Sequence, residues 1–303
     1  MLFLPGDNAT WHGSNDPQNR LFEIEQIAQK LRDAGIRLPE ASRFGRYLRS
    51  ARSMTQSDSS KLPHAQLALN LMTEIREMNL ILQELPRSPE VPGWQSKMHT
   101  ALKGSLLSAE DGADSAGRDA QFELYLASAF RAAGFDVTLD EPDVTFQMDG
   151  QTFGIAAKRV KSEKTVEKRI REASKQIERS GNPGIIALDI TYLYDSTTLK
   201  IVNHLDDVSA RGRNIADEFA MDAARRMESG GWLAGDLTFC LMVCVNVRVT
   251  IMESLHAILG MPIIAPKPAI GFRWTMMGFP GKEADTIMTR INNIKDRIAT
   301  VAF

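Results

Sequence analysis

An acid and a lysine flank a predicted β-hairpin in the middle of this chain. Asp143 follows Pro142 in the segment EPDV, and Lys158 ends the apolar run QTFGIAAK. The dipeptide Asp149-Gly150 between them is a strong hairpin signal, so we expect the two charged side chains to lie near each other. Carboxylate oxygens suit Mg²⁺, and a strand-borne lysine can stabilise charge that develops on a phosphate. The pair therefore points to phosphodiester hydrolysis.

Helices are expected on both sides of this hairpin. The segment 118–134 carries an apolar stripe at helical spacing and ends at Gly134, with Glu123 on its first turns. The segment 162–181 is a second helix, which carries Lys175 and Gln176. A continuous apolar run at 184–190 then suits a strand that is buried on both faces. With short strands at 135–139, 143–148 and 151–158, the expected order is helix, three strands, helix, strand.

These residues and their order resemble the restriction-endonuclease-like PD-(D/E)XK superfamily over residues 118–192. The resemblance implies an α/β fold with an αβββαβ core and a metal-dependent nuclease acting on DNA, less favourably on RNA. It implies that Asp143, Glu123 and the Ala157 carbonyl bind Mg²⁺ or Mn²⁺. It also assigns catalytic roles to Asp143 and Glu123, to Lys158 as the lysine of the second motif, and to Gln176 as an orienting group.

One position departs from the family pattern. Two residues before Lys158 the family carries Asp or Glu, whereas this chain has Ala156. A methyl group cannot bind a cation, so fewer anionic ligands and weaker metal binding are expected. Two interpretations follow: an active nuclease with a reduced site, or an inactive relative that binds nucleic acid or a partner protein. Restoring the acid with Ala156→Glu would distinguish them.

The helix after the hairpin carries a row of cations at spacings of three or four residues, which share one helical face. They are Lys164, Lys168, Arg171, Lys175 and Arg179. Such a face can follow a phosphate backbone, with the glutamates of this helix largely elsewhere. A solvated surface of mixed charge is the alternative interpretation.

The flanking regions extend this core. Helices are predicted at 20–34, 41–52 and 64–85, which gives an all-helical N-terminal region over residues 1–110 after a polar leader. The α/β domain is expected at 111–303, with a mixed extension over 200–303. That extension should contain helices at 206–229 and 283–303 and strands at 236–247 and 269–278.

Composition sets the remaining expectations for this chain of 303 residues with a formal charge of -2. No segment has the roughly 18 apolar residues of a membrane helix, and the start lacks the features of a signal peptide, so a cytoplasmic protein is predicted. Neither a membrane nor a small-molecule cofactor is expected as a partner, and a homo-oligomer is possible. A scaffold or sensor that oligomerises through its apolar strands is a rival from another functional class.

Several residues have simpler interpretations. Cys240 and Cys244 lie in an apolar run and are expected to be buried thiols. Trp232 and Trp274 suit core positions, and Asp189 suits a strand-end carboxylate with a satisfied hydrogen bond. The arginines at intervals of three in the second helix, which are Arg43, Arg46, Arg49 and Arg52, favour packing over nucleic-acid binding.

Overall fold

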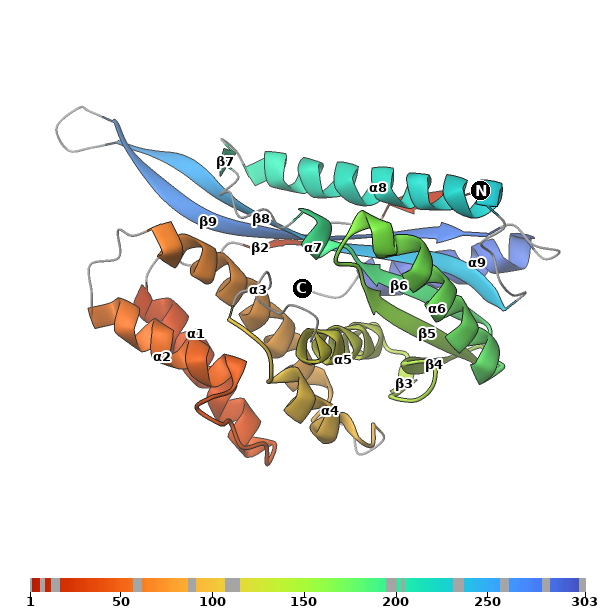
Figure 1. The fold of residues 1–303 in the computed structure, drawn as a ribbon, viewed down its shortest axis with the longest axis horizontal. Coiled ribbons are helices and arrows are strands. Elements are labelled where there is room, and N and C mark those ends of the chain that lie inside the picture. The colour runs from red at the N-terminus through yellow and green to blue at the C-terminus, as the bar shows by residue number, and fades with distance from the viewer. Residues whose placement is uncertain are drawn as a thin grey trace.

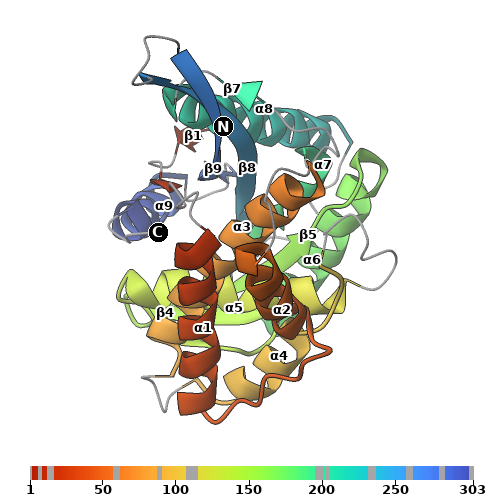
Figure 2. The same ribbon diagram turned by 90° about the vertical axis from the view of Figure 1, so that its left-hand side faces the viewer.

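Helices cover both faces of one mixed, open β-sheet in this chain (Figure 1, Figure 2). The computed structural model describes residues 2–5, 9–11, 17–56, 62–86, 91–106, 115–194, 201–202, 205–230, 237–256, 262–279 and 284–299. Its helices are α1 (Pro17–Asp33), α2 (Arg43–Gln56), α3 (Leu62–Glu84), α4 (Trp94–Ala101), α5 (Ala116–Ala132), α6 (Val166–Ser180), α7 (Thr191–Tyr194), α8 (Leu205–Gly230) and α9 (Ala284–Ala299), with a short 3-10 turn η2 (Glu163–Thr165). Its strands are β1 (Leu2–Pro5), β2 (Ala9–Trp11), β3 (Asp136–Thr138), β4 (Val144–Met148), β5 (Gln151–Arg159), β6 (Gly184–Asp189), β7 (Ile201–Val202), β8 (Thr238–His256) and β9 (Pro262–Gly278).

The sheet has the strand order β1-β9-β8-β6-β5-β4-β3. Strand β6 runs parallel to both β5 and β8, whereas β3, β4 and β5 form an antiparallel meander. The predicted hairpin joins β4 to β5: Met148 pairs with Gln151, and Asp149 and Gly150 have φ values of 53° and 75°. Positive φ at both central residues is the conformation that Asp-Gly favours. The α/β prediction and the element order over residues 118–192, here α5-β3-β4-β5-α6-β6, are confirmed.

The N-terminal region differs from the all-helical prediction. Strands β1 and β2 lie where a loose leader was expected, and both pair antiparallel with β9 from the other end of the chain. Strands of 4 and 3 residues are too short to give a periodic pattern, and their partner is remote in sequence. The strands β8 and β9 are also longer than predicted, and Figure 1 shows them running on as a curved ribbon beyond the body of the sheet.

Two apolar cores lie on opposite faces of the sheet. Alternate residues of β5 divide between them: Phe153, Ile155 and Ala157 face the core formed with α1 to α5 and α9, whereas Ala156 and Val160 face α6 and α8. The predicted burial of Cys240, Cys244 and Trp274 is confirmed. Trp232 lies outside the described residues. Across the described ranges, no helix has both the length and the apolar character that crossing a membrane requires.

A buried network of charged side chains joins the N-terminal helices to α5. Glu74 of α3 forms ion pairs with Arg43 of α2, at 3.4 Å, and with Arg118 of α5. Burial alone would raise the pKa of Glu74, but the two guanidinium groups outweigh it and hold that pKa below its usual value. All three side chains are almost completely buried, so one carboxylate is shared by two arginines that water does not reach.

The other predicted arginines of α2 also contact protein groups. Arg46 donates to the Gly104 carbonyl, Arg49 donates to the Glu40 carbonyl at 2.7 Å, and Arg52 pairs with Glu25 at 3.0 Å. These contacts agree with the packing interpretation.

We predict that Glu74→Gln lowers the free energy of unfolding by about 3–5 kcal/mol, because it removes the negative charge that pairs with two buried arginines. Glu25→Gln removes an exposed ion pair and serves as the control, with an expected loss below about 1 kcal/mol. Urea denaturation measures both. Since the folded pKa of Glu74 is depressed, its contribution is present at neutral pH and is lost as the pH falls through that pKa. Equal losses in the two variants would contradict this account.

Candidate functional site

The candidate site lies where the ladder between β4 and β5 ends. The last pair of that ladder is Val144 with Ile155, so the following residues of β5 pair with β6 alone. The backbone N–H of Ala157 on this open edge donates to Asp143 Oδ2 at 2.9 Å. Asp143 immediately precedes β4, so its carboxylate takes the place of a strand partner.

Close packing fixes the position of Asp143. A Cβ atom on Gly154 would lie 2.7 Å from Pro142 Cδ, so the proline ring rests directly on β5 at a position without a side chain. The Gln176 amide of α6 donates to the Pro142 carbonyl at 3.1 Å. Pro142 is thus held between β5 and α6, and the neighbouring Asp143 is held with it.

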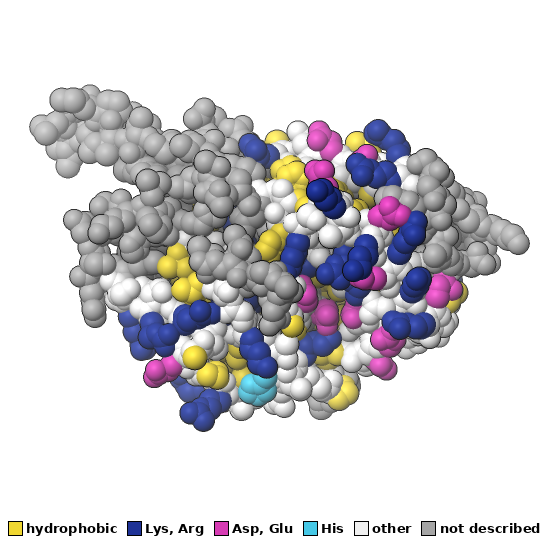
Figure 3. All heavy atoms as spheres, viewed as in Figure 1, with side chains coloured by type: hydrophobic (Ala, Val, Ile, Leu, Met, Phe, Trp, Pro, Cys, Tyr) yellow, Lys and Arg dark blue, Asp and Glu magenta, His cyan; other side chains and the backbone are white. Residues whose placement is uncertain are grey.

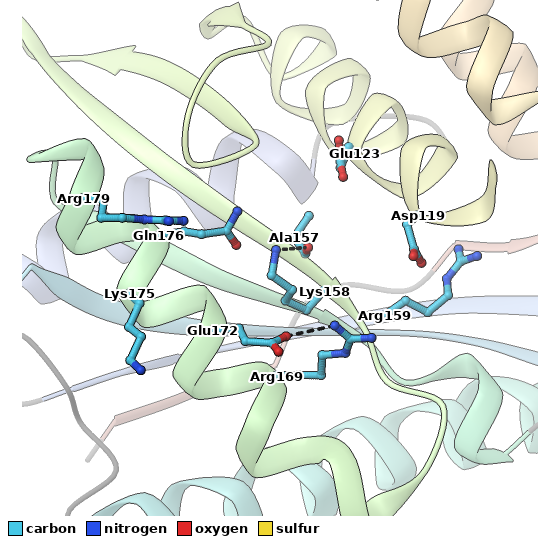
Figure 4. A pocket seen from close by; sticks show the side chains of 10 residues that line it. All are labelled: Asp119, Glu123, Ala157, Lys158, Arg159, Arg169, Glu172, Lys175, Gln176 and Arg179. Carbon is cyan, nitrogen blue, oxygen red and sulfur yellow. Dashed lines mark hydrogen bonds and ion pairs between the residues drawn. The ribbon is translucent and has the colours of Figure 1, made fainter. Parts of the chain in front are cut away.

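Lys158 and Asp143 are in direct contact, as the hairpin predicted. Lys158 Nζ lies 3.1 Å from Asp143 Oδ2. It also lies 3.0 Å from the Ala157 carbonyl oxygen, a contact drawn in Figure 4. The side chains of Lys158 and Asp143 are only 15% and 14% exposed. The ammonium group therefore sits between two of the oxygen atoms that the sequence assigned to a metal ion.

A cleft of about 460 Å³ opens above this pair, between α5, the end of β5 and α6 (Figure 4). Its lining residues are Asp119, Glu123, Ala157, Lys158, Arg159, Arg169, Glu172, Lys175, Gln176 and Arg179. Asp143 is not among them, but it contacts three of them, Ala157, Lys158 and Gln176. All four predicted catalytic side chains are thus brought to one place by different elements of the fold.

Gln176 points from α6 toward the carboxylate. Its Nε2 atom lies 3.5 Å from Asp143 Oδ1, and its Oε1 atom is buried without a hydrogen-bond partner among the described groups. An amide oxygen of this kind can accept a hydrogen bond or contact a cation. Gln176 is thus placed to orient a group that enters the cleft.

Glu123 reaches the cleft from α5 and is paired with Lys97 of α4. Burial raises the pKa of Glu123 above its usual value; the Lys97 ammonium opposes this shift, and the nearby Asp143 carboxylate adds to it. The Glu123 side chain is 18% exposed. It is therefore a second carboxylate at the site, at the end opposite α6.

Ala156 does not contribute to the cleft. Its side chain is completely buried in the apolar core beneath α6, together with Ile170, Ile186 and other apolar residues. Within the described ranges, no group of three or more His, Cys, Asp and Glu side chains is arranged to hold a metal ion. The predicted site residues offer two carboxylates, one carbonyl and one amide as oxygen donors, and the carboxylates of Asp119 and Glu172 also line the cleft.

The predicted basic face of α6 overlaps the cleft only in part. Lys175 and Arg179 line it, whereas Lys168 and Arg171 do not. Lys164 does not line it either, because it lies in the turn η2, before α6 begins at Val166. Lys168 is 74% exposed and lies 3.8 Å from Glu172, and Arg171 pairs with Glu167 at 2.5 Å. The glutamates therefore neutralise part of this face, because residues four apart on a helix are neighbours. Figure 3 shows the resulting mixture of cationic and acidic side chains over α6.

Four lining residues were missed by the sequence analysis: Asp119, Arg159, Arg169 and Glu172. Helical spacing would have indicated three of them, since Asp119 is one turn from Glu123, Glu172 is one turn from Gln176, and Arg169 is one turn from Glu172. Arg159 carried no such signal. It is held by Asp189 of β6 at 2.7 Å, which also gives Asp189 the satisfied, buried position that was predicted.

Comparisons of the chain with protein-family models, with curated proteins and with solved structures found no match.

We predict that Gly154→Ala lowers the free energy of unfolding by about 1–3 kcal/mol, because its Cβ atom would overlap the Pro142 ring. The displaced proline would move Asp143 away from Lys158 and Ala157. Thr152→Ala, on the same face of β5, is the control and should cost less than about 1 kcal/mol. Urea denaturation measures the effect, and a Gly154→Ala variant as stable as wild type would argue against this packing.

Proposed function

We propose that the cleft between α5 and α6 hydrolyses phosphodiester bonds, and that residues 118–192 form a restriction-endonuclease-like core. The observation that supports this most directly is the meeting of Asp143, Glu123, Lys158 and Gln176 at the open edge of β5. Two carboxylates, a lysine and an amide are the groups that metal-assisted phosphodiester hydrolysis needs. DNA is proposed over RNA on the family resemblance.

The donor atoms fit a hard divalent cation. Mg²⁺ is commonly held by one or two carboxylates, by water and by substrate phosphate, so a third protein carboxylate is not required. Asp143, Glu123 and the Ala157 carbonyl would hold Mg²⁺ or Mn²⁺. The cation, when bound, would neutralise charge on the phosphate and lower the pKa of a water molecule.

The chain's own side chains have separate tasks in this proposal. Lys158, displaced from the Asp143 carboxylate, donates hydrogen bonds to a non-bridging phosphate oxygen and stabilises its negative charge. Gln176 orients the attacking water or the phosphate. Arg169, Lys175 and Arg179 bind the backbone on either side of the scissile bond, through contacts that are independent of base sequence.

The alternative function is binding without cleavage, and Ala156 favours it. The position that carries an acid in the family here holds a methyl group in an apolar core, so Ala156→Glu would bury a charge as well as restore a ligand. The Lys158 ammonium already neutralises Asp143. In this alternative the cleft holds a phosphate backbone, and the lysine contacts it while remaining paired.

We predict that purified wild-type protein cleaves supercoiled plasmid or single-stranded DNA in the presence of Mn²⁺ or Mg²⁺, and that EDTA abolishes the cleavage. Asp143→Asn and Lys158→Met should each lower the cleavage rate by at least about 100-fold, as expected when a group that stabilises the transition state is removed. Gel electrophoresis of the DNA over time measures the rates.

The matched control is Arg37→Met, which removes an exposed cation outside the cleft and should retain the wild-type rate. Equal cleavage by wild type and by all three variants would indicate a contaminating nuclease and would contradict the hydrolysis proposal. DNA binding without cleavage would favour the alternative function. Neither binding nor cleavage would favour a scaffold or sensor.

Both functions predict that the affinity for DNA falls as the salt concentration rises. Both also predict that this affinity depends on the cations of α6 that line the cleft. The double variant Lys175→Ala/Arg179→Ala should weaken binding and reduce the slope of log K against log salt concentration by about 1.8, or about 0.9 for each phosphate that the protein no longer neutralises. Lys168→Ala/Arg171→Ala removes the same charge from the part of α6 that does not line the cleft and should change the slope less. Fluorescence anisotropy with labelled duplex DNA measures both slopes, and the reverse ranking would assign binding to the outer face.

A further inference from the structure

The helical N-terminal region supplies one charge to the site. Lys97 of α4 forms its ion pair with Glu123 of α5, and the two side chains are 27% and 18% exposed. Glu123 is one of the two carboxylates proposed as cation ligands. The pair therefore links a helix outside the proposed nuclease-like core directly to the chemistry of the cleft.

The position of Lys97 is fixed by the packing of α4. Trp94, Met98 and Ala101 are buried along one side of this short helix, in the same apolar core as the inner side of α5. Arg43 Nη2 donates to the Ala101 carbonyl at 2.8 Å and ties the end of α4 to α2. With the helix anchored at several points, Lys97 is held against α5.

Each proposed carboxylate ligand has its own lysine. Asp143 is paired with Lys158 from β5, and Glu123 is paired with Lys97 from α4. These two carboxylates and two ammonium groups balance in charge. A divalent cation adds two positive charges among them, so it must compete with both lysines for the same oxygen atoms.

We infer that Lys97 is a positioning residue that holds Glu123 at the edge of the cleft and competes with the cation for its carboxylate. This inference rests on the proposed function, because it takes Asp143 and Glu123 as the cation ligands. Lys97 thereby limits the cation affinity of the site, and the N-terminal region sets that limit. The chain binds its cation weakly both because Ala156 offers no carboxylate and because Glu123 is already occupied.

Mn²⁺ affinity tests the inference without an activity assay. Electron paramagnetic resonance of free Mn²⁺, recorded at the same pH for every variant, gives the Kd of each. Lys97→Met should bind Mn²⁺ about tenfold more tightly than wild type, because one positive charge beside the ligand is removed. Lys97→Arg keeps the counter-ion and should bind as wild type does. Lys103→Met, an exposed lysine just after α4, is the control and should change nothing.

A double-mutant cycle separates competition for Glu123 from a structural effect of Lys97. In the background of Glu123→Gln the ion pair is absent, so Lys97→Met should no longer raise Mn²⁺ affinity. Thermal unfolding without Mn²⁺ reports any loss of stability, which a merely structural lysine would cause without tighter Mn²⁺ binding.

The outcomes distinguish the inference from the proposed function. Binding that Asp143→Asn abolishes but Lys97→Met leaves unchanged would overturn the role of Lys97 and leave the cation site standing. If Lys97→Met raised Mn²⁺ affinity equally in the wild-type and the Glu123→Gln backgrounds, the role of Lys97 would also be overturned. If Lys97→Met bound Mn²⁺ at concentrations at which wild type binds none, that result would support both the cation site and the role of Lys97. No Mn²⁺ binding by any variant would overturn the cation site and the role of Lys97 together.

Discussion

The unequal length of β4 and β5 is the constraint from which the candidate site follows. An antiparallel ladder satisfies backbone groups only where both strands are present, and β4 begins at Val144, opposite Ile155. The next residues of β5 remain part of the sheet through β6, and their other edge is open. A buried N–H without an acceptor would cost free energy, and the Asp143 carboxylate supplies that acceptor at Ala157. The same carboxylate then attracts Lys158 and the Gln176 amide.

Charge balance inside the protein explains why the helical region and the α/β core are joined so closely. Glu74 forms ion pairs with both Arg43 and Arg118 where water cannot reach, so one carboxylate joins α2, α3 and α5. Burying unpaired charges is far more costly than leaving them in water. Charges are also paired at the edge of the cleft, where the side chains are partly exposed. There Lys97 pairs with Glu123, and Lys158 pairs with Asp143. Ions at the rim can exchange partners, whereas those in the interior are held.

The two proposed functions differ in what happens to Lys158. In the hydrolytic function Asp143 would hold a cation, and Lys158, no longer paired with Asp143, would stabilise the charge on the phosphate. In the binding function the ion pair between Lys158 and Asp143 persists, and the cationic side chains of the cleft hold the phosphate backbone without a metal ion. Both use the same surface of α6, where Arg169, Lys175, Gln176 and Arg179 face the cleft. Lys168 and Arg171, which do not line the cleft, pair with Glu172 and Glu167. Two of the lining cations are paired as well, Arg169 with Glu172 and Arg179 with Glu141.

The sequence by itself determined the features that depend on near neighbours in the chain. Asp149-Gly150 specified the hairpin, and the hairpin placed Asp143 and Lys158 near each other. An apolar stripe at helical spacing specified α5, and a continuous apolar run specified the buried strand β6. The tertiary structure decided the rest, because those contacts join residues far apart in the chain. The pairing of β1 and β2 with β9, the Lys97–Glu123 pair and the Glu74 network have no local signature. The sequence also could not show which of two adjacent faces of α6 turns toward the site, because both carry cations at helical spacing. Packing of α6 against the sheet decides this, and it turns Gln176 toward Asp143.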